Sequence, residues 1–379
     1  MISYLLPTHN RPHALWQTLA ALGALSCDEH DVVGGAEVIV VDNASEPAVE
    51  VPPELDNGIP LRCLRLDQNS GAAARNHGAA EARGEWLVML DDDSYPLDTG
   101  HLDVLADAPD DVAAIGAEIL LPDGTREAGG LPEVIVGCGA AIRRDAFLAA
   151  GGYDPSFHYY AEEYDLCAKL LLAGMRVCHD MRFRVRHGKV PDRRDMNVIM
   201  RNLVRNNGWV MQRYAPLHRR EQAICEVIAR YGNIAMTEDA VWGYSQGMCE
   251  LNRTRGDQPA RPMSDAQFDR FTGLSHARTE LSRRPELAGR KRGRVAIVDE
   301  GKHADAVRQA LREIGTRFAA SIQDADVLVI GTLSPGPMLD ARDQRSADPR
   351  PVIMPWCPDG MPEQATTLSG PPPVLREAV

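Results

Sequence analysis

A regular alternation in residues 1–90 constrains the fold of this chain more than any other feature: short apolar runs are separated by longer polar or amphipathic segments. We expect strands at 2–6, 37–41, 61–66 and 86–90, with helices at 13–25 and 71–83. Runs that are apolar throughout are typical of strands buried on both faces, as in parallel sheets. The alternation therefore predicts an α/β fold in which helices sandwich a mostly parallel sheet.

The segments that follow the expected strands are polar and unusual. PTHNRP spans the end of the first strand, DNAS follows the second and DDDS follows the fourth. Ligands of open α/β sheets bind beyond the carboxyl ends of the strands. We therefore expect the functional residues in these loops.

The remainder of the chain divides into two further segments. Residues 198–256 have a helical pattern, and a polar linker with some helix at 264–282 follows. From residue 294 a strand, a helix and a second strand predict a small Rossmann-like α/β unit of unknown role. Its first strand-to-helix turn reads VDEGKH, which lacks GxGxxG and gives a dinucleotide site little support. The expected domains are 1–215, 216–290 and 291–379.

The composition limits the classes of binding partner and the cellular location that we expect. Lys and Arg total 41 and Asp and Glu total 54, a net charge of −13, which is the opposite of what a nucleic-acid partner requires. No run reaches the roughly 18 apolar residues of a membrane span, although peripheral contact with a membrane stays open. The N-terminus has no basic signal-peptide region, and the eight cysteines form no CxxC pair. We expect reduced core thiols and a cytoplasmic protein.

The strongest chemical signal is the run Asp91-Asp92-Asp93 directly after the apolar run WLVML. Clustered carboxylates repel one another, and a divalent cation offsets this cost. Mg²⁺ or Mn²⁺ prefers oxygen ligands and is often held by one or two carboxylates together with substrate phosphates. A solvated acidic turn is the alternative, but the position after a buried strand favours a metal site.

Seven motifs occur in an order that resembles the family 2 glycosyltransferases of the GT-A fold. They are PTHNRP, VVDNAS, NSGAAARNHGA, LDDDS, VGCGAAIRRDAF, GGYDPSF and AEEYDLCAKLLLAG, followed later by His187. The resemblance covers roughly residues 1–215 and does not extend to 216–379. It implies a GT-A catalytic domain, followed here by the helical segment and the small C-terminal α/β unit.

The resemblance also implies a donor site. Asp91 corresponds to the family residue that contacts the nucleotide ribose, and Asp42 to the one that binds the base. From the residues alone, Asn69-Ser70-Gly71 enters a helix whose free N–H groups favour phosphate. Arg75, one turn on, can pair with an oxyanion, although a surface helix charge is the alternative. The nucleotide-binding set implied is Thr8, Asn10, Arg11, Asp42, Asn69, Gly71, Arg75, Asp91 and Asp92.

Two residues are implied as metal ligands. The last aspartate of the motif, Asp93, corresponds to the family ligand of the ion that bridges the diphosphate. His187 stands where the family often has a histidine that completes this site. A lone histidine is more often structural, but a neutral imidazole is a workable Mn²⁺ ligand beside carboxylates.

A second acidic cluster, Glu162-Glu163-Tyr164-Asp165, opens an expected helix. Acidic residues in a first turn often only complement the helix dipole. The family, however, has E-D-x-D-L here, with the second acid as general base. Position 163 is glutamate instead of aspartate, so the base lies between Glu162 and Glu163, and we favour Glu163.

These features predict a metal-dependent, inverting glycosyltransferase that uses a nucleoside diphosphate sugar, with UDP or dTDP preferred because Asp42 suits a pyrimidine imide N–H. The acceptor would be a hydroxyl of a glycan or a small metabolite. A sugar nucleotidyltransferase is the nearest alternative, but it usually has a Gly-rich basic turn where this chain has PTHNRP. A non-catalytic sugar-nucleotide-binding protein is the alternative from another class. A homo-oligomer and the role of 216–379 stay open.

Overall fold

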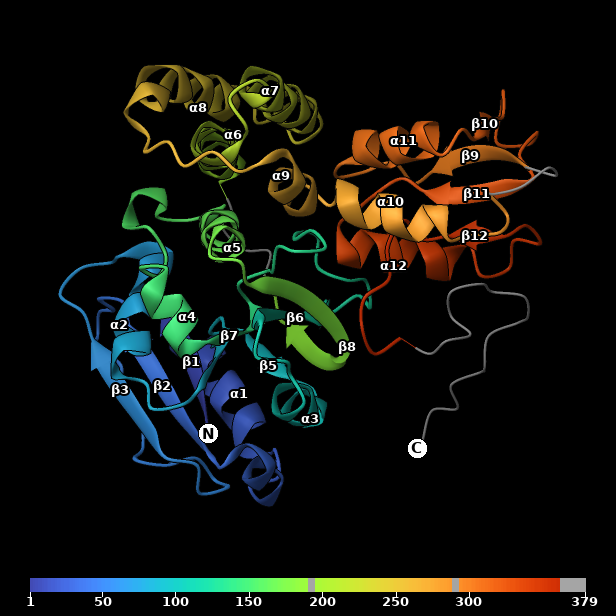
Figure 1. Ribbon diagram of the computed structural model, residues 1–379. Helices are drawn as coiled ribbons and strands as arrows, with labels where there is room; N and C mark the ends of the chain where they lie inside the picture. Colours follow the sequence, from blue (N-terminus) through green and yellow to red (C-terminus); the bar gives the residue numbers. More distant parts are fainter. Residues whose placement is uncertain (190–194, 288–292, 362–379) are drawn as a thin grey trace.

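The computed structural model describes residues 1–189, 195–287 and 293–361, and these form three parts (Figure 1). A domain built on a large sheet carries the N-terminus. A layer of helices covers one end of this domain, and a small α/β unit lies beside that layer.

The large sheet has eight strands in the order β3-β2-β1-β4-β7-β6-β8-β5. Strands β3, β2, β1 and β4 are parallel, β7 runs antiparallel to both β4 and β6, and β5 runs antiparallel to β8. The strands expected in residues 1–90 are confirmed as β1 to β4. The bounds are β1 (Ile2–Thr8), β2 (Ala36–Asp42), β3 (Leu61–Arg65), β4 (Trp86–Leu90), β5 (Ser94–Pro96), β6 (Val112–Leu120), β7 (Gly139–Arg143) and β8 (Arg176–His187).

Helices cover both faces of this sheet because successive strand side chains point to opposite sides. Leu6 and Val40 pack into the core that contains the apolar face of α1. Leu5 and Val41 pack on the other side, with α2, α4 and α5. The predicted fold class, a mostly parallel sheet sandwiched by helices, is confirmed. The helices are α1 (Pro12–Gly23), α2 (Ala74–Glu81), α3 (Gly100–Ala106), α4 (Arg144–Ala149) and α5 (Glu162–Leu172), with short 3-10 helices at Asp28–Val33, Gly71–Ala73 and Pro155–Phe157.

The helical segment follows the large sheet, as expected. Met200 and Val204 of its first helix pack against Tyr231 and Ala235 of its second. Ser264 starts a later helix with a capping box in which its side chain and that of Gln267 exchange hydrogen bonds with the opposite backbone. The bounds are α6 (Met196–Tyr214), α7 (Arg220–Thr237), α8 (Val241–Thr254), α9 (Asp265–Phe271) and α10 (Leu274–Ser282), with a 3-10 turn at Arg255–Asp257.

The C-terminal unit is a parallel four-stranded sheet in the order β10-β9-β11-β12. This confirms the expected strand–helix–strand pattern, and it adds a helix that we did not predict. That helix starts at Ser334-Pro335, an N-cap residue followed by proline at the first helical position, which is a recognisable start signal. The bounds are β9 (Arg294–Val298), α11 (Ala304–Glu313), β10 (Arg317–Phe318), β11 (Val327–Ile330), α12 (Pro335–Gln344) and β12 (Val352–Ile353).

The C-terminal unit packs against the large-sheet domain. Arg126, in the loop after β6, donates from Nη1 to Asp340 Oδ1 of α12 at 2.8 Å and from Nε to Glu118 Oε1 of β6 at 2.7 Å. The backbone of Asp359 also pairs with β8 through His179 and Met181. One continuous apolar core joins the large sheet, α5 and the C-terminal sheet. The unit is therefore placed directly beside the loops at the end of the large sheet.

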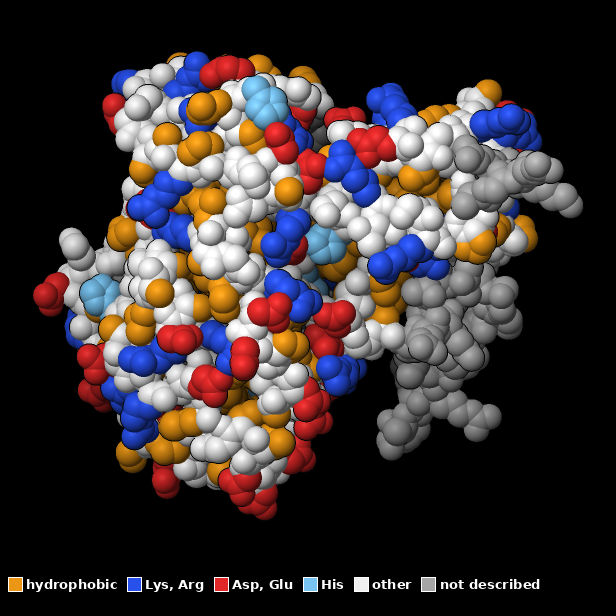
Figure 2. All heavy atoms as spheres, in the orientation of Figure 1, with side chains coloured by type: hydrophobic (Ala, Val, Ile, Leu, Met, Phe, Trp, Pro, Cys, Tyr) orange, Lys and Arg blue, Asp and Glu red, His pale blue; other side chains and the backbone are white. Residues whose placement is uncertain are grey.

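The surface corrects one expectation. Cys27, Cys225 and Cys249 are exposed, so the prediction that the cysteines lie in the core is wrong for these three. Cys27 lies in the turn before the 3-10 helix at Asp28–Val33, and Cys225 and Cys249 lie on α7 and α8. On the face that Figure 2 shows, acidic side chains are interspersed with basic ones. Within the described residues, no helix is both long enough and apolar enough to cross a membrane.

Candidate functional site

A cavity of about 1040 Å³ opens at the carboxyl ends of β1 and β4. The loop between β6 and β7, the start of α5, the end of β8, helices α6 and α7 and the C-terminal unit also contribute to its wall. Of the residues predicted from the sequence, the following line the cavity: Asn10, Arg11, Arg75, Asp91, Asp93, Glu162, Glu163 and His187. Thr8, Asp42, Asn69, Gly71 and Asp92 are not among the residues that line the cavity.

Arg75 is a buried residue of the site and not a surface helix charge. It is 5% exposed, and its guanidinium Nη2 contacts Asp91 and donates to the backbone oxygen of Leu90 at 2.9 Å. Burial opposes the charge, but the Asp91 carboxylate raises the pKa of Arg75 further above its ordinary value. Arg75 therefore stays cationic and fixes one oxygen of Asp91.

Arg11 joins the other two aspartates of the motif. Its Nη1 lies 2.5 Å from Asp92 Oδ1, and its Nη2 lies 2.6 Å from Asp93 Oδ2. Thr8 Oγ1 donates to Asp92 Oδ2 at 2.8 Å, and Asp92 is only 4% exposed. Burial raises the pKa of Asp92 to about 7, although the positive charge of Arg11 opposes this rise. Asp92 thus points into the protein, whereas Asp91 and Asp93 border the cavity.

His187, the last residue of β8, faces these aspartates through one ring nitrogen. Its Nε2 lies 3.5 Å from Asp93 Oδ1 and 4.0 Å from Asp91 Oδ2. Its Nδ1 lies 2.9 Å from Glu127 Oε2. Burial would lower the pKa of His187, but hydrogen bonds with Asp93, Cys138 and Glu127 raise it to about 12. A carboxylate on Nδ1 aims Nε2 in the way that metal-binding histidines are commonly oriented.

This group of side chains fits a divalent cation. The carboxylate oxygens that face His187 Nε2 are those that the two arginines leave free, since Arg75 binds Asp91 Oδ1 and Arg11 binds Asp93 Oδ2. Ligand atoms of Asp91, Cys138 and His187 lie within 4.8 Å of one another. Burial raises the pKa of Cys138 to about 11, which keeps its thiol protonated and a poor ligand. Two carboxylates and an imidazole suit Mn²⁺ or Mg²⁺ better than a thiol site does.

Asp42 and the 69–71 loop support the site from behind. Asp42 is fully buried and accepts hydrogen bonds from Arg65 Nη1 at 2.7 Å and from the backbone of Ser45 at 2.8 Å. Burial would raise the pKa of Asp42, but these hydrogen bonds lower it overall.

Asn69 Oδ1 accepts from the backbone of Gly71 at 2.9 Å and from Asn43 Nδ2 at 3.0 Å. Gly71 has φ +61°, and a Cβ there would lie 2.3 Å from the backbone oxygen of His158. These contacts shape the loops beside the cavity.

The two glutamates at the start of α5 differ in their hydrogen bonding. Glu163 Oε1 accepts from the backbone N–H of Gly137 at 3.1 Å. Glu162 is 7% exposed, and its buried Oε2 has no hydrogen-bond partner among the described residues. Burial raises the pKa of both groups, most strongly that of Glu162, whereas the Gly137 N–H partly opposes the rise at Glu163. Glu163 is therefore the more readily ionised carboxyl of the pair.

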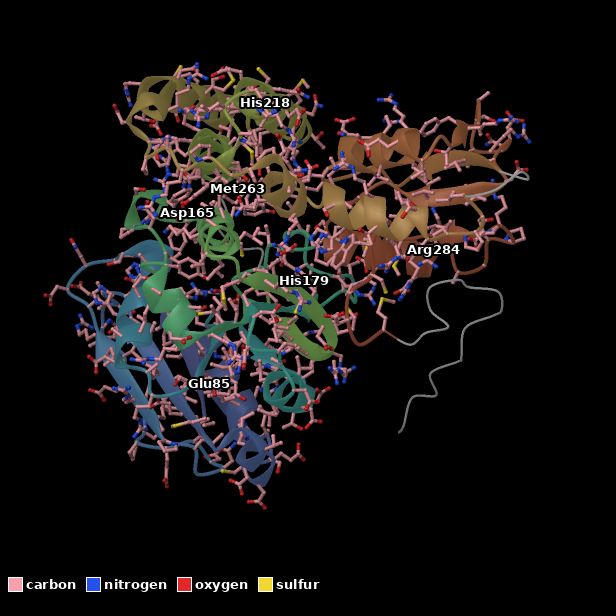
Figure 3. The ribbon with its side chains drawn as sticks, viewed as in Figure 1. Glu85, Asp165, His179, His218, Met263 and Arg284 are labelled. Atoms are coloured by element: carbon pink, nitrogen blue, oxygen red, sulfur yellow. The ribbon has the colours of Figure 1, made fainter. Side chains whose placement is uncertain are left out.

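Asp165, the remaining acid of this cluster, holds α5 to the helical layer. It is fully buried and accepts hydrogen bonds from Arg213 Nη1 and Tyr214 Oη of α6, each at 2.8 Å. Lys169 Nζ lies 2.7 Å from its other oxygen. Figure 3 shows Asp165 at the junction of α5 with the helices above it. The contacts assign this acid a structural role.

We expect Asp165→Ala to lower the free energy of unfolding by about 3–5 kcal/mol, because it leaves the buried Arg213 without this carboxylate. Chemical denaturation followed by far-UV circular dichroism measures the loss. Asp154→Ala is the matched control, since Asp154 contacts the same Arg213 Nη1 at 2.8 Å but is more exposed. Equal losses in the two variants would contradict the role assigned to Asp165.

Sequence reasoning missed several residues of the cavity wall. Glu127 lies in a loop without a periodic pattern, and nothing local connects it to His187, 60 residues away. Lys302 of the C-terminal unit contacts the Tyr164 hydroxyl, and its Nζ lies 4.3 Å from the centre of the Tyr164 ring. The only available signal was the Gly-Lys pair after a strand in VDEGKH.

The large-sheet domain has the mixed α/β architecture, with a central sheet covered by helices on both faces, that a GT-A domain requires. Residues 3–117 match the sequence model described as Glycosyl transferase family 2. The chain thus carries a family 2 glycosyltransferase domain at its N-terminal end, which confirms the resemblance seen in the motifs.

Curated relatives agree with this family. An uncharacterised glycosyltransferase of Bacillus subtilis is 34% identical over 109 residues, 28% of this chain and 37% of the relative. Another from Haemophilus influenzae is 27% identical over 199 residues, 45% of this chain and 62% of the relative. The pre-mycofactocin glycosyltransferase of Mycobacterium tuberculosis is 33% identical over 184 residues, 40% of this chain and 39% of the relative. The chain thus spans less than two thirds of each.

Among solved structures, a fragment of S. aureus TarS in complex with UDP-GlcNAc has a TM-score of 0.49 and 15% identity. The match covers 74% of this chain and 85% of that one. A mannosyltransferase from Pyrobaculum calidifontis in complex with GDP-Man and Mn²⁺ has a TM-score of 0.44 and 15% identity, covering 73% of this chain and 80% of that one.

Proposed function

We propose that this protein is a metal-dependent, inverting glycosyltransferase that transfers a sugar from a nucleoside diphosphate sugar to an acceptor hydroxyl. The observation that carries the proposal is the backbone of Gly137, which contacts both Glu163 and Arg75. Its N–H donates to Glu163 at 3.1 Å, and its carbonyl oxygen lies 3.5 Å from Arg75 Nη2. The candidate base and the cation that holds Asp91 therefore face one cavity on either side of one residue.

We call the part of the cavity lined by Arg11, Arg75, Asp91, Asp93 and His187 the donor half. This half would hold the nucleoside diphosphate. Asp91, Asp93 and His187 would hold Mn²⁺ or Mg²⁺, which when bound neutralises charge on the departing diphosphate. Arg11 and Arg75 keep the aspartates oriented through their ion pairs. Glu127 keeps Nε2 of His187 directed at the same point. These residues pre-organise the donor half before the donor binds.

The donor base remains proposed as uracil or thymine. Asp42 supplies a carboxylate that can accept from a pyrimidine imide N–H. The Arg65 side chain, which is 46% exposed, occupies Asp42 Oδ2. Base binding at Asp42 therefore requires Arg65 to swing toward solvent.

Glu163 would act as the general base. Its carboxylate accepts the proton of the acceptor hydroxyl while that oxygen attacks the anomeric carbon opposite the leaving diphosphate. The hydrogen bond from Gly137 holds Oε1 and leaves Oε2 free for this role. Transfer from an α-linked donor would give a β-linked product.

A thermal-shift panel of nucleoside diphosphates with Mn²⁺, followed by measurement of nucleotide release from the matching sugar donors, tests the proposal. We expect UDP or dTDP to raise the melting temperature most, and the matching donor sugar to be turned over. A shift without turnover for any donor would favour a non-catalytic sugar-nucleotide-binding protein. Turnover of a nucleoside triphosphate with a sugar phosphate would favour a nucleotidyltransferase.

We expect His187→Ala to raise the Mn²⁺ concentration for half-maximal rate by at least about tenfold, because one metal ligand is lost, and Glu127→Gln to raise it by about 10–100-fold. Metal titration of donor turnover measures both. Cys138→Ala is the control from the same cluster and should leave the metal dependence unchanged. Unchanged metal dependence of His187→Ala together with a lower melting temperature would make His187 a structural residue.

A further inference from the structure

A second chamber of about 610 Å³ adjoins the catalytic cavity. It lies between the helical segment and the C-terminal unit, with walls from α6, α7, α9 and the turn between β9 and α11. The two chambers share a set of wall residues: Tyr164, Asn207, Arg230, Tyr231, Gly301 and Lys302. A ligand in the second chamber would therefore border the side of the cavity where α5 carries Glu163.

The second chamber combines apolar walls with the cationic side chains of Arg219, Arg230, Lys302 and Arg312. Val227, Phe268 and Phe271 are among its apolar lining residues. Arg230 of α7 and Lys302 of the C-terminal unit stand at the wall shared with the catalytic cavity. Such a chamber suits a molecule with an apolar part and a negatively charged group.

Neither Arg230 nor Lys302 forms an ion pair with an acidic side chain among the described residues, although the Glu163 carboxylate partly opposes the lowering of the pKa of Lys302. Nε of Arg230 is buried and has no hydrogen-bond partner there, and Lys302 contacts only the neutral hydroxyl and ring of Tyr164. Arg219, which lines the same chamber, shows the usual arrangement, with Nη1 2.6 Å from Asp269 Oδ1. Arg230 and Lys302 are half-buried, and a bound anion offsets the cost of a partly desolvated charge that has no ion-pair partner.

Arg230 and Lys302 both line the wall that the two chambers share. Burial lowers the pKa of Lys302 to about 8 and that of Arg230 below its ordinary value. Burial lowers the pKa of His303 to about 3, and the charges of Lys302 and then Arg230 contribute to this shift. His303 is therefore neutral and leaves the two cations as the charged groups of this wall.

The carboxylates of the chamber are engaged elsewhere. Glu226 Oε1 accepts from Gln222 Nε2 at 2.9 Å. Asp305 has a 92% exposed side chain, 3.9 Å from Arg308 Nε. The first turn of α11, which starts directly after Lys302-His303, also lines the chamber, and the positive end of its dipole adds to the attraction for an anion.

We propose that the second chamber is the acceptor site, and that Arg230 and Lys302 together bind a phosphate or carboxylate group beside an apolar part of the acceptor. The C-terminal unit would then complete the acceptor site by supplying Lys302. Naming the ligand as the acceptor rests on the proposed glycosyltransferase function, whereas the anion site itself does not.

Isothermal titration of the full-length protein with phenyl phosphate, in EDTA to remove metal from the donor half, tests the anion site. We expect binding at least about tenfold tighter than that of benzyl alcohol, which lacks the charge, and about tenfold tighter than that of inorganic phosphate, which lacks the apolar part. Benzoate in a parallel titration separates a carboxylate from a phosphate preference.

Arg230→Gln and Lys302→Gln should each weaken phenyl phosphate binding by at least about tenfold, the usual weight of a charge-assisted hydrogen bond. Arg230→Lys and Lys302→Arg keep the charge and should retain most of the affinity. Arg255→Gln, which removes an exposed arginine paired with Glu221, is the matched control and should bind like the wild type. UDP binding in the presence of Mn²⁺ is measured for every variant as a control. Unchanged UDP affinity shows that the donor half of the cavity is still folded.

Two results would overturn the inference: phenyl phosphate that binds no better than benzyl alcohol, or binding that neither Gln variant weakens. If inorganic phosphate binds as tightly as phenyl phosphate, the claim that the chamber also binds an apolar part of the ligand is wrong. Because these titrations need no sugar transfer, failure of the anion site is distinguishable from failure of the proposed function, which appears as absent donor turnover with Mn²⁺.

Discussion

Replacing Asp93 by alanine is expected to lower sugar transfer by roughly 10²–10³-fold or more and to weaken nucleoside diphosphate binding. The variant removes the oxygen that lies 3.5 Å from His187 Nε2, so a metal would lose a carboxylate ligand. It also leaves a diphosphate facing the remaining carboxylates, Asp91 and Asp92, with less cation between them. Metal-assisted charge neutralisation is worth several kcal/mol, which accounts for the size of the effect.

Nucleotide release with a Mn²⁺ titration, together with a binding isotherm for the nucleoside diphosphate, measures this effect. Asp92→Asn is the neighbouring control. Because Asp92 points into the protein toward Thr8 and Arg11, its loss should change the stability more than the metal dependence. Full activity of the wild type in EDTA would disprove the metal site.

Replacing Glu163 by glutamine is expected to lower the transfer rate by about 10²–10⁴-fold, the usual weight of a positioned general base, while donor affinity stays near that of the wild type. The amide keeps the shape and can keep the contact with Gly137 through its oxygen, but it cannot take a proton. The donor KM should not rise in proportion, since the lost interaction is made mainly in the transition state. Steady-state kinetics with the donor varied measures both quantities.

Glu162→Gln is the control and should have a milder effect, because burial raises the pKa of Glu162 more strongly than that of Glu163 and its Oε2 lacks a partner among the described residues. Exchange of the two phenotypes would place the base at Glu162. If neither variant lowers the rate, the assignment of the base is wrong. Asp165 would then be a weak replacement, because Arg213, Tyr214 and Lys169 already occupy its carboxylate.

The acceptor site gives the C-terminal unit a function that its own sequence does not indicate. The unit lacks a dinucleotide motif in VDEGKH, yet it places that turn against the catalytic domain. Its docking depends on Arg126, which contacts both Asp340 and Glu118. A unit held in this way lines both chambers through Gly301 and Lys302.

Local patterns in the sequence were sufficient to predict β1 to β4 and the loops that follow β1, β2 and β4, but not β5, β6, β7, α3 or α12. Fully apolar runs determine β1, β2 and β4 because only strands buried on both faces tolerate them. The Asp91–Asp93 run and PTHNRP were identifiable because each directly follows or ends such a strand. The order of these motifs was enough to indicate the family.

Only the tertiary structure shows which charged helix residues are buried and which residues far apart in the sequence are in contact. Arg75 and Asp165 both stand on helices where a charge is usually exposed, and only packing shows that each is buried with an ion-pair partner. Glu127 contacts His187, and Lys302 contacts Tyr164, although the two residues of each pair lie on segments far apart in the sequence. Such contacts depend on sheet order and on domain docking, which no local spacing encodes. The sequence therefore determined β1 to β4 and the motifs, whereas long-range packing determined the completed site.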